Sequence, residues 1–414
     1  MKFLNQKFLI YLTLAAAPLY LVKFSLGSLS TNLLELLILL NLLVWFFQKP
    51  KLSFKKNWSD MPWQIKSSLG LILLGLVISI FSNNAILIGL GILKGWFLLP
   101  LFFAYLFFEN TKNTAQIEQS LFGLYCSAFL VALVSLGYKV LGLVTFDGRL
   151  SAFYASPNYL AFYLAPGVLL GSYLAVKTVL TTESFLKKLS LLASFGLLLL
   201  ALFYTYSYGA WLAVFLALAA VSFFAFPKKQ FFLTLSLLLG FLVVATFSQI
   251  HSQKFAGLTT FSKRSSLASR FVIWQAAEKM LLKNPIWGIG PGNFQANYLA
   301  LQPFFPPYLE WAVPEPHNLF LAFWLQAGIL GLVGFIFLLV FIFFWLLKNQ
   351  VRGKITVETV LGAFFLYTIL HGLVDTPFWK NDLAFLFWVF LSIFMANLKN
   401  KQKNTSLCDL YPLK

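Results

Sequence analysis

The stretch LSLLASFGLLLLALFYTYSYGAWLAVFLALAAVSFFAF, residues 189–226, decides how this chain folds. As one α-helix its 38 residues would extend about 57 Å, since each residue adds about 1.5 Å. The hydrocarbon core of a membrane is only about 30 Å thick. The stretch must therefore turn, and its only polar break is YSYG at residues 206–209. We predict two membrane-spanning helices joined at this turn.

The composition of the whole chain agrees with a membrane protein. It is 60% hydrophobic and 11% charged, whereas a soluble domain carries about 25% charged residues. The mean hydropathy is +0.81. Apolar runs of about 20 residues, the length of a transmembrane helix, recur along the chain. They are continuously apolar, which excludes the alternating strands of a β-barrel. We predict an all-α polytopic membrane protein.

The distribution of charge sets the expected topology. Most of the 31 lysines and arginines fall in the expected inner connections, as the positive-inside rule requires. The net charge of +18 therefore indicates membrane orientation, and no nucleic-acid partner is expected. We predict a single integral membrane domain over residues 1–414, with about 12 spans and both termini cytoplasmic. The expected spans are 8–26, 29–47, 67–84, 86–108, 117–144, 158–177, 188–205, 209–226, 230–248, 317–347, 356–373 and 382–398.

One long polar segment, residues 249–316, separates the ninth and tenth expected spans. We predict that it is a large extracytoplasmic loop containing a short helix. Ser265 or Ser266 can cap the start of that helix, and Asn284-Pro285 can end it. This loop is the longest stretch outside the lipid, so we expect the chemistry of the protein to use it.

Arg270 and Trp274 lie four residues apart on this helix and share one face. The helix can present Arg270 to an anion in the membrane, or its basic residues can merely contact lipid phosphates. Periodicity alone favours the second interpretation. The following GIGPGNF, residues 288–294, lacks the spacing of a phosphate-binding glycine motif. We predict an ordinary loop there.

His317 stands where the tenth expected span begins, and an imidazole there suits a general base. A purely structural hydrogen-bonded histidine is the alternative. Glu310 and Glu315 can orient His317, or the three can bind a metal. Their spacing matches no metal template, so no metal is expected.

Two shorter segments are expected on the same outer side of the membrane. Residues 145–164 carry Arg149 and Asn158, and residues 371–385 carry Asp375. Arg149, Arg270 and His317 can thus share one outward cleft, although the sequence alone does not bring them together. Lys94 lies deeper in an apolar run, and is either functional or paired inside the bundle.

Three ordered segments resemble the superfamily of O-antigen ligases and O-antigen polymerases. They are GRLSAFYASPNYLAFYL (148–164), SRFVIWQAAEKMLLKNPIWGIGPGNF (269–294) and EPHNLFLAFWLQAGILGL (315–332). The resemblance extends from about residue 146 to the last span, and the first five spans match only by hydropathy. The ordered trio is fairly specific to the superfamily but not to any one member.

This resemblance implies a metal-independent glycosyltransferase of the GT-C type without a cofactor, in the bacterial cytoplasmic membrane. Such an enzyme moves a glycan from an undecaprenyl-pyrophosphate carrier to a lipid-core, polysaccharide or protein acceptor at the outer face. It implies that His317 activates the acceptor hydroxyl, and that Arg149 and Arg270 bind the pyrophosphate. The residues expected to support them are Asn158, Trp274, Glu315, Asn318, Asp375 and Tyr208.

One position departs from the family pattern. Members often carry an arginine in the turn between the seventh and eighth spans, and this chain has Tyr208 there. A tyrosine brings no charge, so either another donor binds or a different basic residue compensates, such as Lys380 or Arg264.

Two other functions remain alternatives. The first is a transporter or flippase of polysaccharide or lipid-linked glycan, but such proteins usually show internal repeats, and we find no second copy of the motifs. The second is a peptidoglycan polymerase of the shape, elongation and division type. The motif order fits the O-antigen group better.

Overall fold

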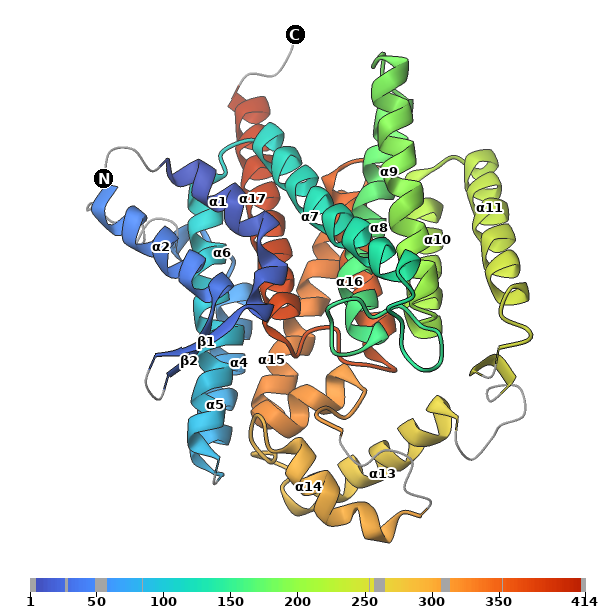
Figure 1. Cartoon of the computed structure of the whole chain (residues 1–414). Helices are drawn as coiled ribbons and strands as arrows, with labels where there is room; N and C mark the ends of the chain where they lie inside the picture. The colour runs from blue at the N-terminus through green and yellow to red at the C-terminus, as the bar shows by residue number, and fades with distance from the viewer. Residues whose placement is uncertain are drawn as a thin grey trace.

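The computed structural model shows a bundle of helices with one small two-stranded sheet among the residues that it describes (Figure 1). The described residues are 5–26, 29–48, 58–83, 85–252, 254–256, 265–306, 313–351 and 353–410.

Nine helices in this part of the chain are long and apolar enough to cross a membrane, so the protein is multi-pass. One of them is composite, with α5 (Ile86–Ile92) and α6 (Leu99–Asn110) joined by a π-helical stretch, Leu93–Leu98. The other eight are α4 (Trp63–Phe81), α7 (Thr114–Val140), α8 (Pro157–Val179), α9 (Phe185–Tyr204), α10 (Tyr208–Ala225), α11 (Lys228–Phe247), α15 (Leu319–Asn349) and α17 (Asn381–Leu410).

The remaining expected spans are shorter or divided. Two apolar helices have 16 residues each, α2 (Leu33–Gln48) and α16 (Val357–Gly372). The expected continuous span at 8–26 is wrong, and so is the helical start of the span at 29–47. Pro18, which cannot donate a backbone hydrogen bond, lies where the first helix stops. The segments in this region are α1 (Gln6–Ala15), a 3₁₀ helix (Ala17–Leu21), and strands β1 (Lys23–Leu26) and β2 (Leu29–Asn32), which pair antiparallel.

The turn at YSYG is where the sequence predicts it. Helix α9 ends at Tyr204 and α10 begins at Tyr208. Tyr206, between them, has a φ of +45°, a left-handed conformation that is uncommon outside glycine. The two helices therefore reverse direction in three residues, and the carbonyls of Thr205 and Tyr206 in this turn accept from side chains of other segments.

Burial separates central helices from peripheral ones. Of the apolar window of α17, 94% is buried inside the protein, against 6% for α11. Helix α11 lies at the edge of the bundle (Figure 1), with most of its apolar side chains free to face lipid. Most side chains of α11 are therefore positioned to contact lipid and not the protein core.

At one end of the bundle, opposite the last turns of α17, lie α13 (Ser266–Lys283) and α14 (Phe294–Leu301) (Figure 1). The predicted bounds of α13 are confirmed, since the Ser265 side chain accepts from the N–H of Ala268 and Asn284 is the C-cap. One side of α13 is buried with Leu325 of α15. The helix is therefore packed onto the bundle through its apolar side.

The glycine-rich stretch after α13 locks it to α15. The N–H of Ile289 donates to the carbonyl of Leu325 at 2.7 Å, and Ile329 donates to the carbonyl of Ile286 at 2.9 Å. Gly328 breaks the helix there with a φ of +65°. Gly288 has a φ of +68°, and a Cβ on it would lie 2.3 Å from the Leu325 oxygen. The stretch is thus a structural loop, as predicted, and it fixes α13 relative to the start of α15.

Candidate functional site

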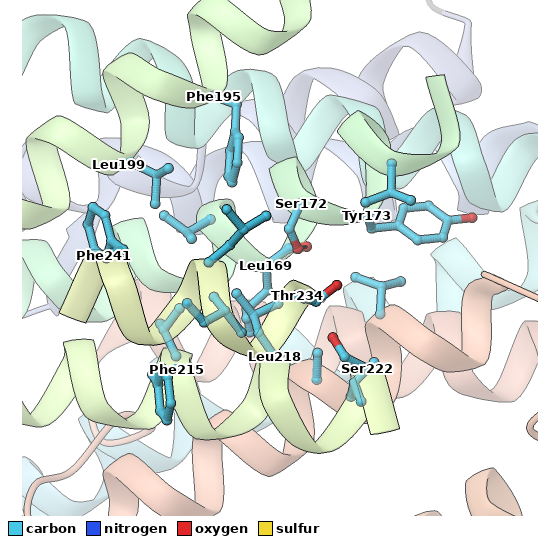
Figure 2. Close-up of a pocket in the computed structure, with 18 of the residues that line it drawn as sticks. Leu169, Ser172, Tyr173, Phe195, Leu199, Phe215, Leu218, Ser222, Thr234 and Phe241 are labelled. Carbon is cyan, nitrogen blue, oxygen red and sulfur yellow. Dashed lines mark hydrogen bonds between the residues drawn. The ribbon is translucent and has the colours of Figure 1, made fainter. Parts of the chain in front are cut away.

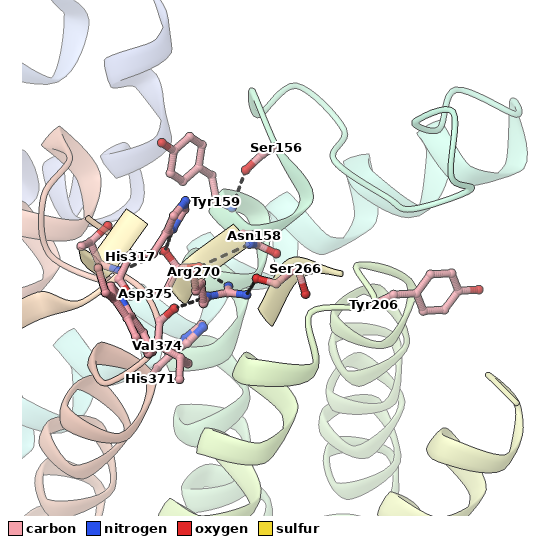
Figure 3. Close-up of polar contacts among 12 residues, drawn as sticks. Ser156, Asn158, Tyr159, Tyr206, Ser266, Arg270, His317, His371, Val374 and Asp375 are labelled. Atoms are coloured by element: carbon pink, nitrogen blue, oxygen red, sulfur yellow. Dashed lines mark hydrogen bonds and ion pairs between the residues drawn. The ribbon is translucent and has the colours of Figure 1, made fainter. Parts of the chain in front are cut away.

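Polar side chains from several segments meet beside α13, and Figure 3 shows Asn158, Arg270, His317 and Asp375 among them. Arg149 comes from the loop before α8, and Asn158 from the first turn of α8. Arg270 comes from α13, and His317 lies just before α15. Asp375 lies between α16 and α17. The structure therefore brings together the three residues that the sequence singled out, with two of the residues expected to support them.

Asp375 is the centre of this arrangement. One carboxylate oxygen, Oδ1, lies 2.8 Å from Nδ1 of His317. The other, Oδ2, accepts from Nη2 of Arg270 and from Nδ2 of Asn158, each at 3.3 Å. The backbone N–H of Thr376 also donates to Oδ1. A single carboxylate thus joins the histidine to the arginine pair.

The surroundings of Asp375 keep it charged. Burial by itself raises the pKa of its carboxyl, but the charge and hydrogen bond of His317 and the charge of Arg270 outweigh burial. The net result holds the pKa well below its usual range. Asp375 is therefore an ionised acceptor that pairs with an Nδ1–H of His317.

His317 is held in an unusual backbone conformation, with a φ of +47°. A left-handed non-glycine residue is strained and is found disproportionately at functional sites. Its carbonyl accepts from Nε1 of Trp274 at 3.4 Å, and Asn318 both caps α15 and donates to the carbonyl of Leu373. The His317 side chain is 24% exposed. With Nδ1 on Asp375, the other ring nitrogen, Nε2, is left for an incoming group.

The two arginines are fixed by backbone carbonyls as well as by side chains. Nε of Arg149 donates to the carbonyl of Thr205 at 2.9 Å, and its Nη2 to Oδ1 of Asn158 at 2.7 Å. Nε of Arg270 donates to the carbonyl of Val374 at 2.6 Å. Burial lowers the pKa of the Arg149 guanidinium from its ordinary value, yet an arginine stays charged in proteins. Both guanidinium groups are thus preorganised permanent cations.

This geometry combines a general base with fixed positive charge. A carboxylate-oriented imidazole can take a proton from a hydroxyl, as in hydrolytic triads. Planar guanidinium groups suit phosphate oxygens, which they bind with paired hydrogen bonds. The arrangement therefore suits attack by a hydroxyl on a substrate with an anionic phosphate leaving group.

Residues 193–336 match the family described as O-antigen ligase. This region is therefore similar to the superfamily of O-antigen ligases and polymerases. No curated protein matches the chain. The matched region includes Arg270 and His317, whereas Arg149 and Asp375 lie outside it. The match supports a ligase- or polymerase-type enzyme at the level of the family.

Glu315 does not contact His317 in the way that the sequence led us to expect. Its Oε2 accepts from Nε2 of Gln326 at 2.5 Å, and Oε1 of Gln326 accepts from the N–H of Gly292. Glu315 thus ties the segment before His317 to α15 and to the glycine-rich loop, while Asp375 orients the imidazole. Glu310 lies outside the described residues.

The buried position of Glu315 leads to a testable pH dependence. Burial raises the pKa of its carboxyl well above the usual value, against the opposing effect of the Gln326 hydrogen bond. The folded protein therefore loses stability as the pH rises from the unfolded value, about 4.3, towards the folded one. Glu315→Gln keeps an acceptor for Gln326, so we expect a melting temperature a few degrees higher at neutral pH and less dependent on pH. Thermal melting in detergent measures both.

Glu315→Ala is the comparison, because it removes the acceptor and leaves Gln326 unpaired in the interior. We expect it to melt below the wild type at every pH. A Glu315→Gln variant that melted lower than wild type, with the same pH dependence, would show that Glu315 is ionised in the folded protein.

The cation that lies over Tyr208 is neither of the two that the sequence suggested. Nζ of Lys254 is 4.6 Å from the centre of the Tyr208 ring. Lys380 instead lies over the ring of Tyr159, at 3.3 Å. Arg264 is outside the described residues. Sequence reasoning missed Lys254, whose neighbours carry no motif.

Lys94 is accounted for by an ion pair. Its Nζ lies 2.8 Å from Oε2 of Glu35 and donates to the carbonyl of Ser30 at 2.8 Å. These contacts favour the interpretation of Lys94 as a paired lysine.

A large apolar cavity of about 350 Å³ opens among α8, α9, α10, α11 and α16 (Figure 2). Phe203 and Trp211 line it next to the turn between α9 and α10, and Phe226 and Ile355 line it near the other end of these helices. Its lining is almost wholly apolar, so it suits a hydrocarbon chain. The cavity begins at the turn whose carbonyl at Thr205 binds Arg149.

Within the described ranges, no group of three or more His, Cys, Asp or Glu side chains is placed to hold a metal ion. Among the described residues, Arg149 and Arg270 bring positive charge to the site.

Proposed function

We propose that this protein transfers a glycan from an undecaprenyl-pyrophosphate carrier to an acceptor hydroxyl at the outer face of the bacterial cytoplasmic membrane. The acceptor is a lipid core, a polysaccharide or a protein. The observation that carries the proposal is Asp375, which contacts both the base candidate His317 and the cation Arg270. A site for general-base attack on a diphosphate-activated substrate needs these two parts side by side.

In the proposed reaction, Nε2 of His317 takes the proton of the acceptor hydroxyl. The acceptor oxygen forms a bond to the anomeric carbon of the glycan. The bond from that carbon to the phosphate oxygen breaks, and its electron pair leaves with the lipid diphosphate. Arg149 and Arg270 stabilise the charge that develops on the leaving group, in place of a metal ion.

The apolar cavity supports a lipid-linked donor. Its lining residues Phe203 and Trp211 stack at 5.3 Å between ring centres, directly beside the turn that binds Arg149. A diphosphate at the arginines would therefore place the start of its isoprenoid tail at the opening of the cavity. We propose that the tail lies between α11 and the bundle, where the low burial of α11 gives access from the lipid.

The proposed orientation places the end of the bundle with α13 outside the cell and both termini in the cytoplasm. This orientation rests on the surplus of basic residues in the loops that are expected on the cytoplasmic side, at the end of the bundle away from α13. An outer site suits acceptors assembled outside the cytoplasm. Membrane lipids would surround the peripheral helices.

Arg270→Ala tests the role of the cations. We expect it to slow transfer from a polyprenyl-diphosphate-linked glycan by about 10²-fold or more, the usual cost of removing one preorganised stabiliser of developing charge. Arg270→Lys keeps the charge but not the planar fork that donates to Val374 and Asp375, so we expect only partial recovery. Transfer is measured with purified protein in proteoliposomes.

Lys283→Ala is the matched control, because Lys283 is an exposed cation in the last turn of the same helix. We expect it to transfer at the wild-type rate. Equal rates for Arg270→Ala and Lys283→Ala would contradict the proposed function. Movement of lipid-linked glycan across the membrane by wild type, without any transfer, would favour a flippase instead.

A further inference from the structure

We propose that Lys254 is a third cation of the donor site, binding the diphosphate together with Arg149 and Arg270. This inference rests on the proposed function, and it assigns a binding role to a residue that no sequence motif marks.

Lys254 and Arg149 are anchored to adjacent residues of one turn. Nε of Arg149 donates to the carbonyl of Thr205, and Nζ of Lys254 donates to the carbonyl of Tyr206. The left-handed conformation of Tyr206 shapes this turn, and its side chain points away from Arg270 (Figure 3). The backbone therefore holds the ammonium close enough to the guanidinium for their charges to interact.

The aromatic ring of Tyr208 supports the ammonium without neutralising it. Nζ of Lys254 lies 4.6 Å from the ring centre, within the range of a cation–π interaction. An ammonium has three donors, and only one has an acceptor within the part of the chain that the structure describes. The other two N–H groups are available to an anion.

The charges around Lys254 and Arg149 favour the binding of an anion. Neither Lys254 nor Arg149 forms an ion pair with a carboxylate in the described residues. Asp375 is already shared by His317 and Arg270. Asp147 lies nearby but is exposed, and its Oδ1 accepts from the Thr145 hydroxyl. Cations gathered with so little compensating charge suit a ligand with at least two negative charges, such as a diphosphate diester.

The charge on Lys254 is expected to respond to the ligand. Burial and, to a smaller extent, the charges of Arg149 and Arg270 lower the pKa of its ammonium to about 7, against the opposing effect of Asp147. A bound diphosphate would raise this pKa, so binding would take up a proton. Donor affinity should therefore be greatest below about pH 7 and fall as the pH rises from there towards the pKa of the complex. Among the described residues, the other groups that contact the Lys254 ammonium are the backbone of Tyr206 and the ring of Tyr208.

The test measures the Kd of a short-chain polyprenyl-diphospho-N-acetylglucosamine with purified protein in detergent, between about pH 6 and pH 9. This probe is a diphosphate diester, so its own phosphates do not titrate in that range. Lys254→Gln keeps one N–H donor for the Tyr206 carbonyl but removes the charge. We expect it to weaken binding about 10-fold or more below pH 7, as for the loss of one charge-assisted hydrogen bond. Its affinity should be flat with pH.

Lys254→Arg carries a permanent charge, so we expect wild-type affinity at about pH 6 and little loss as the pH rises. Lys279→Ala is the control, because Lys279 is an exposed cation on α13 that lies over the ring of Phe305. It should keep the wild-type Kd and pH profile. Melting curves confirm that each variant is folded.

The outcomes separate the two proposals. If wild type binds the probe, Arg149→Ala weakens binding and Lys254→Gln behaves as Lys279→Ala, then Lys254 is no part of the site and the proposed function stands. A wild type that bound no lipid diphosphate at any pH would overturn both. A loss in Lys254→Gln that was the same at every pH, with Lys254→Arg no better, would show a structural role for the lysine and overturn the inference.

Discussion

His317→Ala is expected to reduce the rate of glycan transfer by about 10²–10⁴-fold, the contribution of a positioned general base. Asp375 holds Nδ1 of His317 at 2.8 Å, which leaves Nε2 to accept the proton of the attacking hydroxyl. The arginines do not depend on the imidazole for their anchoring carbonyls. The Kd of the donor should therefore change little, so that the loss falls on the rate of a single turnover.

His251→Ala is the matched control for this variant. His251 is exposed and precedes α13 in the chain, so its removal should leave both the rate and the donor Kd at wild-type values. A His317→Ala protein that transferred glycan as fast as His251→Ala would exclude His317 as the base. A large loss of donor affinity with an unchanged turnover rate would make it a binding residue instead.

The parts of the fold that were predicted correctly are those specified by neighbouring residues. The turn at YSYG follows from the length of one apolar block, and α13 follows from a serine cap and an Asn-Pro stop. Both signals lie within one continuous segment of the chain. The loop at residues 288–294 was likewise recognised from its glycines, although what it packs against was not.

The two elements that the sequence did not predict, the β1–β2 hairpin and the break in α15, have different causes. The β1–β2 hairpin replaces the end of one expected span and the start of the next. The sequence did not reveal it, because hydropathy is averaged along the chain and hides single polar residues such as Asn32. The break in α15 at Gly328 arises where the loop after α13 bonds to it through the backbone of Ile286 and Ile289. No local pattern encodes such a contact.

The sequence predicted which residues form the site, but it did not predict which of them contact one another. Topology alone placed Arg149, Arg270 and His317 on one expected face. Nothing in the sequence favours Asp375 over Glu315 as the partner of His317, since both are acidic residues in segments expected near it. The structure distinguishes them, because Glu315 bonds to Gln326 while Asp375 faces the imidazole. Lys254 was hidden for the same reason, as its neighbours are brought to it by other elements.

Asp375→Asn should have an effect as large as that of removing the base. Oδ2 of Asp375 accepts from Arg270 and Asn158, and Oδ1 accepts from the N–H of Thr376 and pairs with His317. An asparagine has one acceptor oxygen, so its NH₂ must face donors on one side or the other. Where a comparable aspartate orients a catalytic histidine, its replacement by asparagine lowers kcat by about 10⁴-fold. We expect a loss of about 10²–10⁴-fold in transfer rate.

Two features of this loss would separate a role in the site from a general loss of folding. Because the pKa of Asp375 is held below its usual range, its stabilising charge is lost only as the pH falls through that low value. The defect of Asp375→Asn should therefore be constant across neutral pH.

Asp60→Asn is the control, since Asp60 forms a more exposed ion pair with Lys399, and it should transfer normally. If Asp375→Asn kept the wild-type rate, His317 would not need a carboxylate to act, and the link between base and cations that carries the proposed function would be lost. If Asp375→Asn melted far below wild type and its loss of rate matched its loss of folded protein, its defect would belong to folding.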